Sequence, residues 1–195
     1  FSRDEFVAMA ELSTKEGQLA QQELKIVKNL LLLRETIVKS AMTPSSVVFS
    51  LAENMSIEEF FQQHENVPFS RMPIYSEAKE AVSGFVLRND LLLAKAQGHT
   101  KNKINEYKRE IYTGLDSMKL TEAFDVFLRK RSHIMLIVDE YGGMKGILTL
   151  EDVLETLLGL EIVDESDKTV DMQKLASRLW KTRAKKLGLN IDEFK

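Results

Sequence analysis

The sequence lacks several features that would narrow its class. It contains no cysteine, which excludes a disulfide framework and thiolate chemistry. Its hydrophobic runs reach only a few residues, as at 30–33, whereas a membrane-spanning helix needs roughly 18. Its net charge of −3 gives no reason to expect nucleic acid or an anionic membrane as a partner. What remains is an ordinary globular composition, 44% hydrophobic and 29% charged, in 195 residues that can form one large or two small domains.

Signatures of catalysis are also scarce. The glycine pair at 142–143 is not followed by the lysine and helix of a phosphate-binding loop. The carboxylates of 139–140 and of 151–152 are adjacent in sequence, so their side chains diverge and do not share one substrate. The three histidines lie in separate contexts without a metal-ligand partner at a suitable spacing: His64, His99 and His133. We therefore expect no enzyme activity, no catalytic residue and no metal site built from protein side chains.

The first 35 residues predict a helical hairpin. Ser2 and Glu5 have the capping-box spacing, which predicts a helix running to about Leu12. A second helix is predicted over 21–34, with one apolar face. The residues of that face are Leu24, Val27 and Leu31.

After Pro44 the chain contains an internal repeat, its most informative feature. The residues that coincide at a shift of 62 positions are Ser70 and Ser132, Gly84 and Gly146, and Asp90 and Asp152. A helical pattern at 57–61 matches 121–125 at a shift of 64. The segment between this helix and the serine should therefore differ in length by two residues between the copies. Neither copy is large enough to bury its own sheet face, so the two copies should pack into one globule.

The second copy shows the repeating unit most clearly. After an amphipathic helix, the sequence predicts an apolar strand over 134–138 and a tight turn over 139–143, whose glycines supply the positive φ of a reversal. A second strand is predicted over 146–148, and a further helix begins after Thr149.

The stretch Thr149-Leu150-Glu151-Asp152 allows two interpretations. As a helix cap, the Thr149 hydroxyl accepts a backbone N–H and the Asp152 carboxylate faces the positive helix end, contributing about 1 kcal/mol. As a nucleotide clamp, the same helix end binds phosphate, the hydroxyl bonds a phosphate oxygen, and the carboxylate accepts from both ribose hydroxyls. The spacing alone favours the cap.

The last part of the chain differs in composition. After Asp167 its cations are not interrupted by an acid: Lys174, Arg178, Lys181, Arg183, Lys185 and Lys186. Leucines fall on one helical face beside Trp180, which favours a solvated helix that docks on the body or on a second subunit. The alternative is a helix lying on a membrane surface.

Three segments resemble a known family. They are VKSAMTP (38–44), SRMPIY (70–75) and VDEYGGMKGILTLEDVLETLLG (138–159), and they resemble the cystathionine-β-synthase (CBS) domain pair, or Bateman module, of the CorC/cyclin M magnesium and cobalt transport proteins, also called hemolysin-related. The resemblance implies an α+β fold, a tandem CBS pair of two βαββα units with small sheets flanked by helices. The expected domains are a helical hairpin at 1–36, a first CBS domain at 37–96, a second at 97–163, and a partly helical tail at 164–195.

The resemblance also implies a regulatory role. The family's CBS pairs bind adenine nucleotides, ATP or AMP, with Mg²⁺ accompanying the nucleotide, and they associate as homodimers. The chain begins with Phe1, and we expect the family's membrane domain to precede it. The full-length protein would then lie in the cell membrane, with this part on the cytoplasmic side. The family's helical bundle is usually acidic, whereas residues 1–35 hold six acids and five basic residues, which argues against direct magnesium sensing there.

The nucleotide-binding positions follow from the same resemblance. Thr149 and Asp152 match the family's phosphate and ribose positions, which favours the clamp. The segment leading into one repeat packs near the helix start of the other, which brings Thr43 and Pro44 close to Thr149. The extended stretch whose backbone can read adenine is Ser70, Arg71, Met72, Pro73 and Ile74. Within it Arg71 is the candidate for phosphate charge, and the simpler interpretations are a solvated cation and strand punctuation by proline.

The first copy provides an internal control. Leu87 stands where the second copy has its threonine, although Asp90 is retained. A leucine cannot bond a phosphate, and Arg88 can compensate only in part. We therefore expect a second, weaker site made of Asp90, Arg88 and His133.

Two functions are compatible with the sequence. One is a module that senses an adenine nucleotide and transmits its binding to a membrane transporter, and the other is a structural dimerisation module that has lost its ligand. Both predict a homodimer, because the second helix of each copy, at 90–94 and 152–158, carries more apolar residues than one small sheet can cover. The strongest case is the group Val153, Leu154, Leu157 and Leu158.

Overall fold

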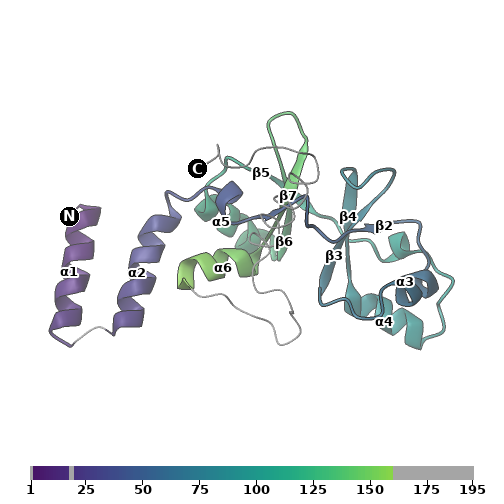
Figure 1. Cartoon of the computed structure of the whole chain (residues 1–195), viewed down its shortest axis with the longest axis horizontal. Coiled ribbons are helices and arrows are strands. Elements are labelled where there is room, and N and C mark those ends of the chain that lie inside the picture. The colour runs from purple at the N-terminus through teal and green to yellow at the C-terminus, as the bar shows by residue number, and fades with distance from the viewer. Residues whose placement is uncertain (1, 18–19, 160–195) are drawn as a thin grey trace, which may run out of the picture.

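Figure 1 shows the arrangement of the chain in a computed structural model, which describes residues 2–17 and 20–159. The basic tail predicted after Asp167, and the whole domain predicted at 164–195, lie outside the described residues. None of the helices within the described ranges is long and apolar enough to cross a bilayer.

The N-terminal hairpin is confirmed. Helix α1 (Arg3–Lys15) begins after Ser2, whose hydroxyl accepts the Glu5 N–H while the Glu5 carboxylate accepts the Ser2 N–H. This helix runs three residues beyond the predicted end at Leu12 and stops before Gly17, which has φ +74°. Helix α2 (Gln21–Leu33) begins at the predicted residue. Of the predicted apolar face only Leu24 is buried, and the other buried side chain of α2 is Leu33.

The predicted βαββα unit occurs twice. Figure 1 shows the first unit at the end of the molecule away from the hairpin and the second unit beside it. The first unit consists of β2 (Leu51–Ala52), α3 (Ile57–Gln63), β3 (Arg71–Tyr75), β4 (Val82–Leu87) and α4 (Arg88–Ala96). The second consists of β5 (Tyr112–Leu115), α5 (Leu120–Lys130), β6 (Ile134–Val138), β7 (Met144–Thr149) and α6 (Leu150–Leu158). The sheets have the strand orders β2-β3-β4 and β1-β7-β6-β5, where β1 is Thr43–Pro44.

The structure corrects the alignment of the two copies. Helices α3 and α5 begin after Ser56 and Lys119, whose N–H groups donate to Glu59 and Glu122, a shift of 63 and not 64. The predicted match of Ser70 with Ser132 is also wrong: the Ser70 carbonyl accepts from the first residue of α4, and the His133 carbonyl accepts from the first residue of α6. The shift becomes 62 only after the hairpin, because its loop spans 76–81 in the first unit and 139–143 in the second.

Each unit has its own apolar core, and the segment leading into one unit packs on the other unit. The lead-in of the first unit, residues 36–44, contains the 3-10 turn η1 (Val38–Ser40) and β1. Val38 is fully buried in the core of the second unit, and β1 pairs with β7. The lead-in of the second unit, residues 102–110, contains η2 (Ile104–Tyr107), whose Ile104 is fully buried in the core of the first unit. The two chain-order domains therefore interlock in space.

The apolar surplus predicted on α6 is largely covered within the chain. Val153 is buried in the core, while Leu154, Leu157 and Leu158 are half-buried. Helix α2 packs against α6, and the Lys25 ammonium donates to the Gly159 carbonyl oxygen at 2.9 Å. The more exposed leucines lie on α4, where Leu92 is 45% and Leu93 58% exposed. Of the two second helices, α4 and not α6 thus carries the stronger apolar patch.

Candidate functional site

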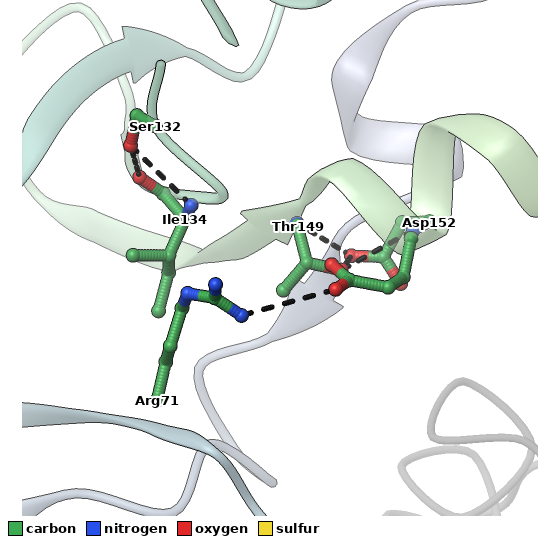
Figure 2. A network of polar contacts seen from close by, with 6 residues as sticks. Arg71, Ser132, Ile134, Thr149 and Asp152 are labelled. Atoms are coloured by element: carbon green, nitrogen blue, oxygen red, sulfur yellow. Dashed lines mark hydrogen bonds and ion pairs between the residues drawn. The ribbon is translucent and has the colours of Figure 1, made fainter. Parts of the chain in front are cut away.

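The start of α6 is a complete capping box. Thr149 ends β7 in an extended conformation, and its Oγ1 accepts the Asp152 N–H at 3.2 Å. Asp152 Oδ2 in turn accepts the Thr149 N–H at 2.7 Å and its hydroxyl at 2.8 Å (Figure 2). The cap interpretation is therefore confirmed. It does not exclude the clamp, because a nucleotide would use the same hydroxyl and carboxylate.

Asp152 is electrostatically unusual. Burial raises the pKa of its carboxyl from 3.8 to about 6, against the lowering effect of the two Thr149 hydrogen bonds and with a smaller raising effect of the Glu151 charge. Ionising this group in place is therefore costly. Two donors from a ligand, such as the vicinal hydroxyls of a ribose, would stabilise the carboxylate that burial disfavours.

Arg71 reaches this helix start from the other unit. It is the first residue of β3, and Figure 2 shows its side chain extending towards the beginning of α6. One guanidinium nitrogen lies 3.9 Å from Glu151 Oε1, in a loose and partly exposed ion pair. The second unit thus supplies the cap and the first unit supplies the positive charge.

Strand β1 lies beside β7 as expected. Thr43 pairs with Ile147 and Pro44 with Gly146, so both residues lie within a few positions of Thr149 along the same edge. Gly146 makes this approach possible, because a Cβ there would overlap the Thr43 carbonyl.

The residues of the weaker site are engaged within the first unit. Leu87, the N-cap of α4, makes no side-chain cap. Arg88 turns inward and donates to the Val67 carbonyl at 2.6 Å. Asp90 Oδ2 accepts from the Arg109 guanidinium at 2.8 and 3.2 Å. Sequence reasoning missed Arg109. The two lead-in segments, which carry Thr43 and Arg109, have little sequence in common beyond one buried apolar residue each, Val38 and Ile104, so the sequence did not show that they correspond.

Comparisons with known proteins fit this architecture. The CBS domain family model matches residues 107–159. A UPF0053 protein of Synechocystis sp. is 33% identical over 181 residues, covering 93% of this chain and 52% of that protein. The magnesium and cobalt efflux protein CorC of Escherichia coli K12 is 26% identical over 185 residues, covering 94% of this chain and 63% of that protein.

Solved structures provide the decisive likeness. The CBS domain of a bacterial CNNM/CorC family Mg²⁺ transporter superposes with a TM-score of 0.76 at 27% identity, covering 84% of this chain and 99% of that one. The chain is a pair of CBS domains similar to those of the CorC family. A structure of the bacterial CNNM/CorC CBS domain in complex with ATP aligns with a TM-score of 0.65 at 27% identity, covering 71% of this chain and 99% of that one.

The structure brings only some of the predicted nucleotide-binding residues together at the start of α6. Met72, Pro73 and Ile74 are buried, so only their backbone is available to a ligand. Ser70 is exposed, and its carbonyl already accepts from Arg88 N–H. The residues that lie together are Thr149, Asp152, Thr43, Pro44 and the Arg71 side chain. The side chains of the β3 core residues are buried and not available at this place.

The described part of the CBS pair contains no group of three or more side chains suited to hold a metal ion. His133 is exposed, and its backbone carbonyl accepts the Leu150 N–H. The donor set at α6 fits a ribose and a phosphate better than a bare divalent cation, since its two carboxylates, Glu151 and Asp152, stand with a hydroxyl and a guanidinium.

Proposed function

We propose that this CBS pair binds an adenine nucleotide, ATP with Mg²⁺, at the start of α6. The observation that carries the proposal is the meeting of a buried carboxylate and a threonine hydroxyl on α6 with the Arg71 guanidinium of the first unit. In this proposal the ribose hydroxyls donate to Asp152, the backbone N–H groups and the hydroxyl at the helix start turn to phosphate oxygens, and Arg71 neutralises phosphate charge.

Binding requires a rearrangement of the cap. Asp152 Oδ2 now accepts two hydrogen bonds from Thr149, and Oδ1 takes part in neither of them. A ribose can first use Oδ1 and then compete for Oδ2, which leaves the Thr149 hydroxyl able to turn towards phosphate. Mg²⁺ would arrive with the phosphates. The ATP complex of the bacterial CNNM/CorC CBS domain supports this choice of ligand.

We infer that the whole protein is a membrane protein that exports magnesium or cobalt, with this part as its cytoplasmic regulatory module. The supporting facts are the names of the relatives and their greater length, since the chain spans 52% of the Synechocystis protein and 63% of CorC. Helix α2 would connect the α6 site to the preceding part of the protein, because Lys25 of α2 donates a hydrogen bond to Gly159 at the end of α6 opposite Thr149.

We further propose that the pairs form a homodimer through α4. Leu92 and Leu93 protrude from this helix, and burying two such side chains per subunit would remove a sizeable apolar patch from water. The second candidate function, a structural dimerisation module without a ligand, rests on this same patch and on the completeness of the α6 cap.

A calorimetric titration with ATP and Mg²⁺ tests the binding proposal. Thr149→Val and Asp152→Ala should each reduce affinity about ten- to a hundredfold, since each removes a hydrogen bond to a charged group. Each should cost the fold only about 1 kcal/mol, the usual worth of a cap. Asp90→Ala, at the equivalent position of α4, is the matched control and should leave affinity unchanged.

The two functions separate cleanly in this experiment. If the wild type binds no nucleotide, or if both α6 variants lose stability but bind as the wild type does, the helix start is only a cap. A dimer that persists under those conditions would establish the structural module.

A further inference from the structure

The exchange of lead-ins gives the two helix starts equivalent neighbours. At the second unit, Thr43 pairs with Ile147 beside Gly146. At the first unit, Arg109 forms an antiparallel bridge with Phe85 beside Gly84, with N–H to carbonyl distances of 2.8 and 3.0 Å. Arg109 therefore has the same position at the first unit that Thr43 has at the second unit.

The two carboxylates also correspond, but their partners differ. Asp90 and Asp152 are each the third residue of their helix. Asp152 is held by a neutral hydroxyl and an N–H of Thr149. Asp90 receives two N–H donors from a cation, and both go to Oδ2. A guanidinium thus already supplies paired donors of the kind that two ribose hydroxyls would supply.

We propose that Arg109 closes the nucleotide site of the first unit, so that each chain binds one nucleotide, at α6. This inference rests on the proposed function of the α6 site. Closure has two parts: Leu87 removes the hydroxyl that would bond phosphate, and Arg109 satisfies the carboxylate that would bond ribose.

An open anion site at α4 is the competing interpretation, and the geometry disfavours it. Arg109 is committed to Asp90, so an incoming phosphate would face that carboxylate. Arg88 is turned towards the Val67 carbonyl. Lys108, the next cation of the lead-in, lies 3.7 Å from a Glu53 carboxylate oxygen. The three cations around this helix start therefore all have partners in the first unit.

The test is the stoichiometry of ATP and Mg²⁺ binding by calorimetry, using the whole chain. The wild type should bind one equivalent, and Leu87→Thr alone should still bind one within the measured range. Leu87→Thr with Arg109→Thr should bind two, the second at least tenfold more tightly than any second event in Leu87→Thr. Adding Asp152→Ala to this variant should remove one equivalent and leave one at α4.

Two further variants separate the effect of Arg109 on binding from effects on folding or on the surface in general. Leu87→Thr with Arg109→Gln removes the positive charge but retains more of the arginine side chain than threonine does, and it replaces the first variant if that one does not unfold cooperatively. Arg129→Thr, an exposed position on α5, is the surface control and should change nothing.

Two equivalents in the wild type or in Leu87→Thr alone would overturn the inference, as would a folded double variant that binds no more equivalents than the wild type does. If the wild type binds none while the double variant binds one, the function proposed for α6 fails and the closing role of Arg109 stands.

Discussion

The carbonyl oxygen of Thr43 lies against the α-carbon of Gly146, with no room between the two strands for a side chain. The equivalent contact in the first unit is looser, since a Cβ on Gly84 would lie 2.6 Å from the Arg109 carbonyl oxygen. These two glycines allow each lead-in to pair with the opposite unit, so they hold the interlocked pair together.

Gly146→Ala should lower the free energy of unfolding by about 1–3 kcal/mol, because the new methyl group forces β1 away from β7. Gly84→Ala should cost less, because its contact is looser and the Lys108 side chain near it can move. Urea unfolding of both variants measures the difference. Lys145→Ala, next to Gly146 on β7, is the control and should cost no more than an exposed ion pair. An unchanged midpoint for Gly146→Ala would contradict the packing described for β1.

Stability should depend on pH through Asp152. Its folded pKa of about 6 lies above its ordinary value of 3.8, so the folded state holds the proton more tightly than the unfolded chain. This contribution is fully present below about pH 4 and is lost as the pH rises through 6. The free energy of unfolding of the wild type, minus that of Asp152→Asn, should therefore increase by on the order of 2 kcal/mol between pH 7.5 and pH 4. A difference that stays constant with pH would show that the carboxyl is not perturbed.

Substitutions of Arg71 and Glu151 should change the binding of the phosphates and not the binding of the nucleoside. Arg71→Met should weaken ATP binding about tenfold or more and leave adenosine binding unchanged, since the guanidinium is proposed to meet phosphate. Glu151→Gln should strengthen ATP binding by a smaller factor, because it releases Arg71 from a 3.9 Å ion pair and removes a negative charge. Parallel titrations with the two ligands measure both effects. Equal losses for ATP and adenosine in Arg71→Met would place the arginine away from the phosphates.

The dimer should depend on α4. Leu93→Glu should shift the chain to monomer at tens of micromolar, because a charge would enter the proposed interface. Leu128→Glu on α5 is a matched control, since both leucines are 58% exposed, and it should not affect association. Light scattering distinguishes the two variants. A wild type that is monomeric at this concentration, or a dimer lost equally in both variants, would rule out α4 as the specific interface.

Local patterns predicted the elements well. The capping boxes at Ser2 and Thr149 each begin a helix, because the signal lies within four residues. The βαββα unit and the pairing of Thr43 with the second unit followed from the family resemblance and are confirmed.

What sequence reasoning missed depends on partners far away in the chain. The serine at 132 was matched with Ser70 by letter, whereas backbone hydrogen bonding to the following helix matches Ser70 with His133. The apolar side chains of α6 looked surplus because the pattern of one helix does not show that α2 covers it. Arg109 gave no signal, since its partner Asp90 is 19 residues away and the pair exists only once the lead-in crosses over.

The crossing of the lead-ins has a consequence for how the protein is made. The first unit lacks the fully buried Ile104 until the chain has been extended past α4, and the second unit uses Val38, which is synthesised before either sheet. A ribosome that has released only residues up to about 100 therefore presents a first unit with an open core. The first unit therefore completes its core only when the lead-in of the second domain has also emerged. A chain cut between α4 and η2 would separate each unit from a fully buried side chain of its core, Ile104 for the first unit and Val38 for the second.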